Sequence, residues 1–170
     1  MAARALLPEN RIPAASCRPG GQSLQVVERS AIVSFTPAQM FAVVNDVARY
    51  PEFLPWCVGA RVEPVSATEM LASVKITRGV LRTEFTTRNS LQQDAQIIMR
   101  LVDGPFRQLL GQWRFEAIGE RGSQLHFRVE FEFKNRLTAA AFNHTFEVLC
   151  GTIVDAFARR AQSIYGAGNG

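Results

Sequence analysis

The sequence predicts an α+β fold in which a curved antiparallel sheet of about six strands wraps around one long C-terminal helix. Between about residues 57 and 134 apolar and polar residues alternate, as expected for strands with one buried and one solvated face. After residue 138 the apolar residues recur at helical spacing instead. The chain has 170 residues, of which 47% are hydrophobic and 20% charged, which suits one domain with a substantial core.

Residues 24–35 have the apolar content of a first strand, and a well-marked helix follows them. Thr36 can cap this helix, Pro37 suits its first position, and Gln39 lies where a capping box is closed. One apolar stripe follows at i, i+3, i+4 and i+7, formed by Met40, Val43, Val44 and Val47. The helix should end before Pro51, because a proline pushes the preceding residue out of the α region.

The next segment, Y-P-E-F-L-P-W at residues 50–56, is the most unusual part of the chain. Four large apolar or aromatic side chains are grouped around two prolines, where a protein surface usually has polar turn residues. We expect a loop that either plugs the core or guards the mouth of an apolar pocket. The residues alone leave both interpretations open.

The clearest strand has an apolar residue at every second position, formed by Leu125, Phe127, Val129, Phe131 and Phe133. Turn signals at residues 78–79, 103–105 and 119–122 divide the alternating region into a meander of five to seven strands. Asp103 belongs to one of these turns, where its carboxylate can bond to the backbone.

The last helix is expected over about residues 138–165, capped by Asn135 or Thr138 and stopped at Gly166. Its apolar stripe has spacings of four, three, four and four, and consists of Phe142, Phe146, Leu149, Ile153 and Phe157. A helix of this size is about 42 Å long, enough to lie across the whole sheet. Gly151 in its middle either lets the helix approach the sheet or leaves room for a ligand.

The net charge of +4 is mild, and about half of it lies in residues 1–24. Such a charge permits contact with RNA or an anionic membrane without demanding either. The strands carry the basic residues Lys75, Arg82, Arg88, Arg100, Arg114 and Arg128. The acidic residues among them are Glu84, Glu116, Glu130 and Glu132. Two alternatives follow: cross-strand ion pairs, or a phosphate-binding patch.

Cys17, Cys57 and Cys150 lie far apart and in no zinc-binding pattern, so we expect free thiols, a reducing compartment and no metal site. No apolar run reaches the length of a membrane span. We expect residues 1–24 to be a disordered extension, with a transit peptide as the alternative, and residues 167–170 to be a tail around the domain at 25–166.

Catalytic chemistry has little support in the sequence. His126 falls on the polar face of its strand, and His144 lies beside the apolar stripe of the last helix. Neither histidine has an evident nucleophile as partner, and the chain has no glycine-rich phosphate loop. We therefore predict a protein that is not an enzyme and has no catalytic residues.

Several segments, in this order, resemble the coenzyme Q-binding START-domain family, whose bacterial branch includes the RatA-type ribosome association toxin. They are M-F-A-V-V-N-D-V-A-R-Y-P-E-F-L-P-W-C from residue 40, F-T-T-R-N from 85, L-V-D-G-P-F from 101, G-Q-W-R-F from 111 and V-E-F-E-F-K-N from 129. The resemblance covers about residues 25–166 and implies a helix-grip, START-like fold with a deep apolar cavity.

Two functions follow from this resemblance as expectations. The first is non-catalytic binding of ubiquinone or a similar polyprenyl lipid, as a ligand rather than a cofactor, in support of respiratory electron transport. The alternative is a toxin that binds the large ribosomal subunit and blocks subunit joining. A polyketide cyclase-type enzyme shares the fold but lacks support from an acid–base set. We expect a cytoplasmic protein with peripheral contact to the inner membrane and no DNA partner.

The resemblance also favours the gate over the plug for residues 50–56. The expected ligand-binding residues are aromatic or aliphatic side chains of that segment, the sheet and the last helix: Tyr50, Phe53, Leu54, Trp56, Phe85, Trp113, Phe127, Phe131, Phe142, Phe146, Leu149, Ile153 and Phe157.

Overall fold

The computed structural model of the chain describes residues 24–166. Apart from Leu24, the predicted N-terminal extension lies outside these residues, as do Cys17 and the tail at 167–170. The predictions made for those parts therefore stay predictions.

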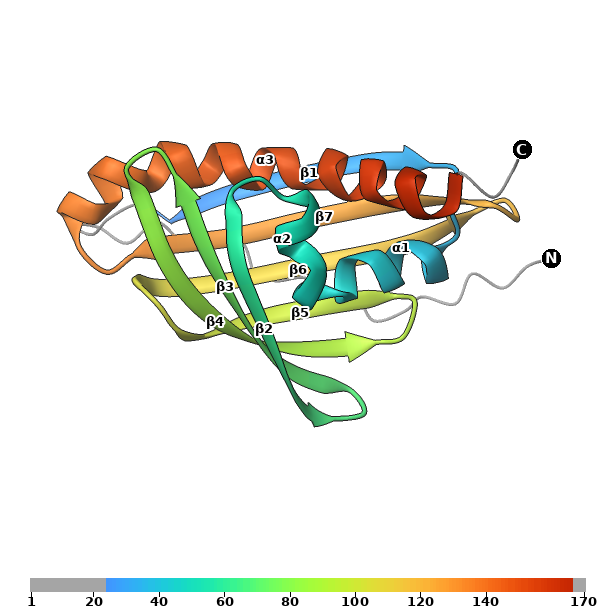
Figure 1. Cartoon of the computed structure of the whole chain (residues 1–170), viewed down its shortest axis with the longest axis horizontal. Coiled ribbons are helices and arrows are strands. Elements are labelled where there is room, and N and C mark those ends of the chain that lie inside the picture. The colour runs from blue at the N-terminus through green and yellow to red at the C-terminus, as the bar shows by residue number, and fades with distance from the viewer. Residues whose placement is uncertain (1–23, 167–170) are drawn as a thin grey trace.

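Seven antiparallel strands form one sheet in the order β1-β7-β6-β5-β4-β3-β2. Their bounds are β1 Gln25–Val33, β2 Cys57–Ser66, β3 Glu69–Arg78, β4 Leu81–Gln92, β5 Gln96–Asp103, β6 Phe106–Ile118 and β7 Gly122–Phe133. Strands β2 to β7 form the predicted meander, and β1 pairs with β7, so the first strand joins the last at one end of the sheet (Figure 1). The sheet has one strand more than the six expected, and the α+β helix-grip fold is confirmed.

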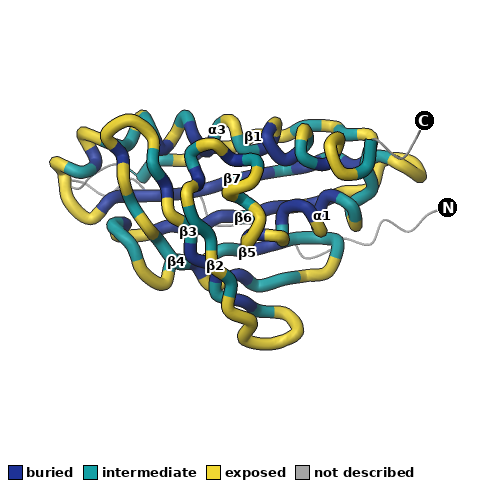
Figure 2. The backbone as a smooth tube through the Cα atoms, in the orientation of Figure 1, coloured by how far each residue is buried: buried dark blue, intermediate teal, exposed yellow. Residues whose placement is uncertain are grey.

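The alternation in β7 is confirmed from Gln124 to Val129, where the apolar residues are buried and the polar residues between them are partly exposed. Nearer the end of the strand, Glu130 and Glu132 are buried as well, at 6% and 8% exposure. Buried backbone is concentrated in the long strands and on the sheet-facing side of the last helix (Figure 2). Rings of Phe106, Phe131, Phe133 and Phe146 contact one another there, with centroids 4.6 to 6.3 Å apart. The core of the domain is therefore an aromatic layer between sheet and helix.

Helix α1 (Pro37–Asn45) begins as predicted. The Thr36 side chain accepts a hydrogen bond from the Gln39 backbone N–H, and the Gln39 side chain accepts one from the Thr36 N–H, which closes the capping box. The stripe Met40, Val43, Val44 and Val47 is buried. These interactions fix the direction in which the chain enters the next segment.

Residues 50–56 do not form the simple loop that we expected. A 3₁₀ turn η1 (Val47–Arg49) is followed by a short helix α2 (Tyr50–Phe53), so helical backbone continues across Pro51. Pro51 takes the second helical position, where its missing N–H costs nothing. The Leu54 N–H donates to the Tyr50 carbonyl at 2.9 Å, and this bond helps to hold Tyr50 in the α region despite the proline.

Helix α3 (Arg136–Tyr165) has 30 residues and a length of about 45 Å. Asn135 caps it by accepting a hydrogen bond from the Thr138 N–H at 2.7 Å. The helix lies along β1 and β7 (Figure 1). At Gly151 an added Cβ would come 3.0 Å from the Arg29 guanidinium of β1, so this glycine leaves room for the end of the Arg29 side chain.

Candidate ligand cavity

A partly open cavity of about 100 Å³ lies between the sheet and α3. Strands β3 to β7 supply most of its wall, α3 supplies one side, and the η1–α2 segment with Trp56 supplies another. The lining is almost wholly apolar, and no charged side chain among residues 24–166 lines it. Such a space suits a small neutral group, because burying an unpaired charge there is very costly.

Eight of the thirteen predicted side chains line this cavity: Tyr50, Trp56, Phe85, Trp113, Phe127, Phe146, Leu149 and Ile153. The other five, Phe53, Leu54, Phe131, Phe142 and Phe157, do not. Phe131, Leu54 and Phe157 are fully buried among other side chains. Whether any of the thirteen binds a ligand stays a prediction.

The apolar stripe of α3 lines the cavity in its middle part and packs against α2 in its later part. Phe146, Leu149 and Ile153 line the cavity, whereas Phe157, one turn further, packs against α2. Its ring lies 5.2 Å from that of Tyr50 and 5.5 Å from that of Phe53. The spacing of apolar residues predicts which side chains share one face of a helix. It does not predict which of them are covered by a neighbouring element instead of lining a cavity.

The segment 50–56 packs into the core at one residue and lines the cavity at two others, and its role as a gate at the mouth stays a prediction. Leu54 is 0% exposed and is part of the packed core. Tyr50 and Trp56 line the cavity, and the Tyr50 hydroxyl donates a hydrogen bond to the Val44 carbonyl. The segment is therefore both a plug at Leu54 and a wall of the cavity on either side of it.

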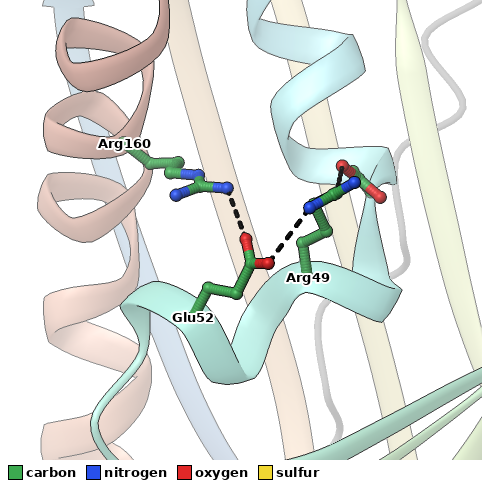
Figure 3. A network of polar contacts seen from close by, with 4 residues as sticks. Arg49, Glu52 and Arg160 are labelled. Carbon is green, nitrogen blue, oxygen red and sulfur yellow. Dashed lines mark hydrogen bonds and ion pairs between the residues drawn. The ribbon is translucent and has the colours of Figure 1, made fainter.

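Polar contacts tie α2 to α3 across the outside of this wall (Figure 3). The Glu52 carboxylate receives a hydrogen bond from Arg160 of α3 at 2.8 Å and another from Arg49 at 3.0 Å. The Arg160 guanidinium also lies 4.9 Å from the centre of the Phe53 ring. The wall formed by α2 is thus attached by contacts that are partly exposed to solvent, and these are weak individually.

Two polar side chains of β4 face the cavity and were missed by the sequence analysis. Thr87 and Asn89 line the cavity and are 5% and 3% exposed. The Thr87 Oγ1 donates a hydrogen bond to the Asn89 Oδ1 at 2.7 Å. The signal was present in the alternation, because Phe85, Thr87 and Asn89 occupy successive inward positions of one strand.

The remaining missed residues are mostly small or aliphatic: Val47, Ala72, Val74, Ile76, Met99, Leu109, Gly111, Val129 and Cys150. An added Cβ at Gly111 would lie 2.4 Å from the Met99 Cε, so the Met99 side chain occupies space that the glycine leaves. Nothing in the sequence marks this pair as neighbours until the β5–β6 register is known, which places Met99 opposite Gly111.

Burial keeps the titratable groups of the cavity neutral. Desolvation raises the pKa of the Cys150 thiol from 9.0 to about 12, and burial also raises the pKa of the Tyr50 hydroxyl. Neither group is therefore an anionic nucleophile near neutral pH. His126 lies outside the cavity, with its Nε2 3.5 Å from a Glu116 carboxylate oxygen, and His144 is exposed.

The basic residues of the strands mostly form ion pairs, and those of Arg88, Arg128 and Lys75 are cross-strand pairs as the first alternative predicted, whereas Arg114 pairs within its own strand. Arg88 pairs with Glu69 at 2.6 Å, Arg114 with Glu116 at 3.1 Å, and Arg128 with Glu28 at 2.6 Å. Lys75 lies 4.0 Å from Glu84. Arg82 and Arg100 have no ion-pair partner among the residues that the structure describes.

Residues 33–158 match the family described as polyketide cyclase / dehydrase and lipid transport. The chain belongs to this family. A similar solved structure is that of the 18 kDa protein CC1736 from Caulobacter crescentus, at 32% identity and a TM-score of 0.66. The match covers 85% of this chain and 99% of that one. A START superfamily protein from Mycobacterium smegmatis has the same fold at 15% identity, with a TM-score of 0.66 and coverage of 82% and 98%.

Among relatives in this family, the ribosome association toxin RatA of Vibrio cholerae is 46% identical over 84% of this chain and 99% of its own length. The mitochondrial coenzyme Q-binding protein COQ10 of Drosophila melanogaster is 25% identical over 79% of this chain and 57% of its own length. Similarity to RatA is thus much stronger than similarity to COQ10. Among the described residues, no helix is long and apolar enough to span a membrane.

Proposed function

We propose that this protein associates with the ribosome in the manner of RatA and acts by binding rather than by catalysis. The observation that carries the proposal is the 46% identity to RatA across 99% of that relative. This function was the alternative in the sequence analysis, and the comparisons favour it over lipid binding. Among residues 24–166 no acid–base pair lines the cavity, which favours a role without catalysis.

The outer face of the sheet offers a site for a polyanion. Arg100 on β5 lies opposite Arg88 on β4, and like charges in that position destabilise a sheet. Glu69 neutralises Arg88, whereas Arg100 is exposed and has no ion-pair partner among residues 24–166. An RNA phosphate would supply the missing charge, and we infer that the large ribosomal subunit is the partner.

Sucrose-gradient sedimentation of ribosomes with added protein tests this proposal. At low salt we expect the protein to sediment with the large subunit and the population of joined ribosomes to fall. Both effects should weaken steeply as salt is raised, because cation–phosphate binding releases counterions. Unchanged subunit joining at low salt, with the protein remaining at the top of the gradient, would refute the proposal.

The cavity supports a second candidate function, the binding of a small apolar ligand. We infer a neutral lipid such as ubiquinone, taken up through peripheral contact with a membrane and held as a ligand in support of respiratory electron transport. A ligand of that size needs more room than about 100 Å³, since pockets for small molecules usually have about 300–1,000 Å³. We infer that the added room comes from movement of α2 away from α3, which would break the Glu52–Arg160 contact.

Organic extraction of the purified protein followed by mass spectrometry tests this candidate, together with titration of added decylubiquinone. A Trp56→Ala variant should bind the quinone more weakly, because Trp56 contributes to the cavity wall. If no quinone co-purifies and none binds saturably, lipid binding of this kind is excluded. If Trp56→Ala lowers only the free energy of unfolding, the side chain serves the core and not the ligand.

A further inference from the structure

Among the residues that the structure describes, the cavity wall contains a polar side chain, Asn89, whose hydrogen-bonding capacity is only partly used. The Asn89 side chain makes a single hydrogen bond to the described residues, in which its Oδ1 accepts the Thr87 hydroxyl at 2.7 Å. An amide has two N–H donors on its nitrogen, and those of Asn89 have no partner in the described part of the chain. Asn89 is only 3% exposed and lines the cavity, so its nitrogen keeps only a small accessible surface.

An unpaired buried donor is unfavourable, and native proteins rarely keep one without a reason. Replacing Asn89 by leucine would preserve size and remove this cost from a wall that is otherwise apolar. The Thr87 hydroxyl fixes the orientation of the Asn89 amide, because it donates a hydrogen bond to the amide oxygen. The amide nitrogen then remains free to donate to another group. The amide nitrogen is therefore a preoriented donor in the wall of the cavity.

The surroundings of Asn89 define the ligand further. Aromatic rings of Phe85, Trp113 and Phe127 line the same cavity, which suits a flat group. No charged side chain of residues 24–166 lines it, so a carboxylate would be buried without a counterion. A neutral ligand with a carbonyl oxygen meets both conditions.

We propose that Asn89 is the specificity-determining residue of the cavity and donates its amide N–H to a carbonyl oxygen of a neutral, ring-bearing apolar ligand. Thr87 is the positioning residue that holds the amide in this orientation. This inference rests on the second candidate function, the binding of an apolar ligand, and is independent of association with the ribosome.

Three small probes test the inference: acetophenone, ethylbenzene and benzoate. The first two differ mainly in a carbonyl group, and benzoate adds a negative charge. Dissociation constants for the full chain are measured by nuclear magnetic resonance titration, with the Asn89 side-chain amide as a reporter. We expect acetophenone to shift this amide resonance, ethylbenzene to leave it nearly unchanged, and benzoate not to bind at pH 7.

The Asn89→Leu variant supplies the decisive comparison. The ratio of the acetophenone and ethylbenzene dissociation constants should change about tenfold in favour of ethylbenzene, as expected for loss of one hydrogen bond in a buried site. Glu69→Ala is the control, because Glu69 pairs with Arg88 on the outer face of the sheet, does not line the cavity and should leave that ratio unchanged.

The possible failures can be told apart. If both neutral probes bind but the ratio is the same in Asn89→Leu, the role of Asn89 is refuted while the cavity remains a binding site. If neither probe binds, both the inference and the second candidate function fail. Tight binding of benzoate would refute the selection for neutral ligands. If Asn89→Leu does not fold, an unshifted Asn89 amide in the wild-type protein with acetophenone bound overturns the proposal.

Discussion

Two buried groups, the Cys150 thiol and the Tyr50 hydroxyl, keep their protons at alkaline pH values at which they would ionise in water. Cys150 and Tyr50 both line the cavity, and desolvation is the largest cause of the raised pKa of each. Because the charged form is disfavoured in the folded state only, each group links folding to pH. The link acts on the alkaline side, where an unfolded thiol ionises and the folded one does not.

We therefore predict that stability falls above pH 9 and that Cys150→Ala reduces this fall. The thiol has a pKa of about 12 in the fold against an ordinary value of 9.0, so its stabilising contribution is complete below pH 9 and is lost as pH rises toward 12. Each pH unit in that interval should cost about 1.4 kcal/mol more in the wild type than in the variant. Urea unfolding at several pH values measures this, and parallel curves for the two proteins would contradict it.

Gly104 is the second residue with a specific role, in the turn between β5 and β6. It has a φ of +148°, and an added Cβ would come 2.6 Å from the Phe85 Cβ. Phe85 in turn lines the cavity and contacts the Phe106 ring at 5.5 Å. The D-G-P turn found in the sequence therefore supports the aromatic wall of the cavity rather than any chemistry of Asp103.

We expect Gly104→Ala to lower the free energy of unfolding by about 2 kcal/mol or more, because it adds both backbone strain and a collision. Gly79→Ala is the matched control. Gly79 also has a positive φ, +59°, but an added Cβ meets nothing within 4 Å. The control should cost about 1 kcal/mol from backbone strain alone. Equal losses in urea unfolding would show that the contact with Phe85 has no importance.

At the scale of elements, α2 is the part that differs most from the sequence-based expectation. The strands and α3 were predictable because periods of two and of three to four persist over many residues. The segment 50–56 has no such period, and its helical turn depends on tertiary contacts of Tyr50 and Phe53 with Phe157. For the same reason the aromatic residues could be assigned to the interior, but not divided between core and cavity.

The contact between α2 and α3 should control how often the cavity wall opens. Glu52→Ala removes the partner of Arg160 and one of the two partners of Arg49, so local opening should become easier by about 0.5–1 kcal/mol. The backbone amide of Leu54, which bonds to the Tyr50 carbonyl at 2.9 Å, should then exchange its hydrogen about two to five times faster.

Glu69→Ala is the control for this prediction, because it breaks the exposed pair with Arg88 on the other face of the sheet. Exchange at Leu54 should be unchanged in that variant. If Glu52→Ala leaves the exchange at Leu54 unchanged as well, packing of Phe53 and Tyr50 on Phe157 holds the wall without the polar contacts.

At the scale of the whole molecule, the two candidate functions use different surfaces. The cavity lies between the sheet and α3, whereas Arg88 and Arg100 lie on the opposite, outer face of the same strands. Inward and outward side chains alternate along β4 and β5, so changes on one face leave the other intact. Each function can therefore be removed without the other.

Arg100→Gln tests the outer face in this way. The variant should unfold within about 0.5 kcal/mol of the wild type or be slightly more stable, since it removes a like charge opposite Arg88. Its association with ribosomes should weaken, and the slope of log affinity against log salt should fall by about one, the share of one phosphate contact. Arg114→Gln is the matched control, because Arg114 already pairs with Glu116 at 3.1 Å and should leave the slope unchanged. If both variants keep the wild-type slope, Arg100 does not contact phosphate, and the ribosome must be bound through another part of the surface.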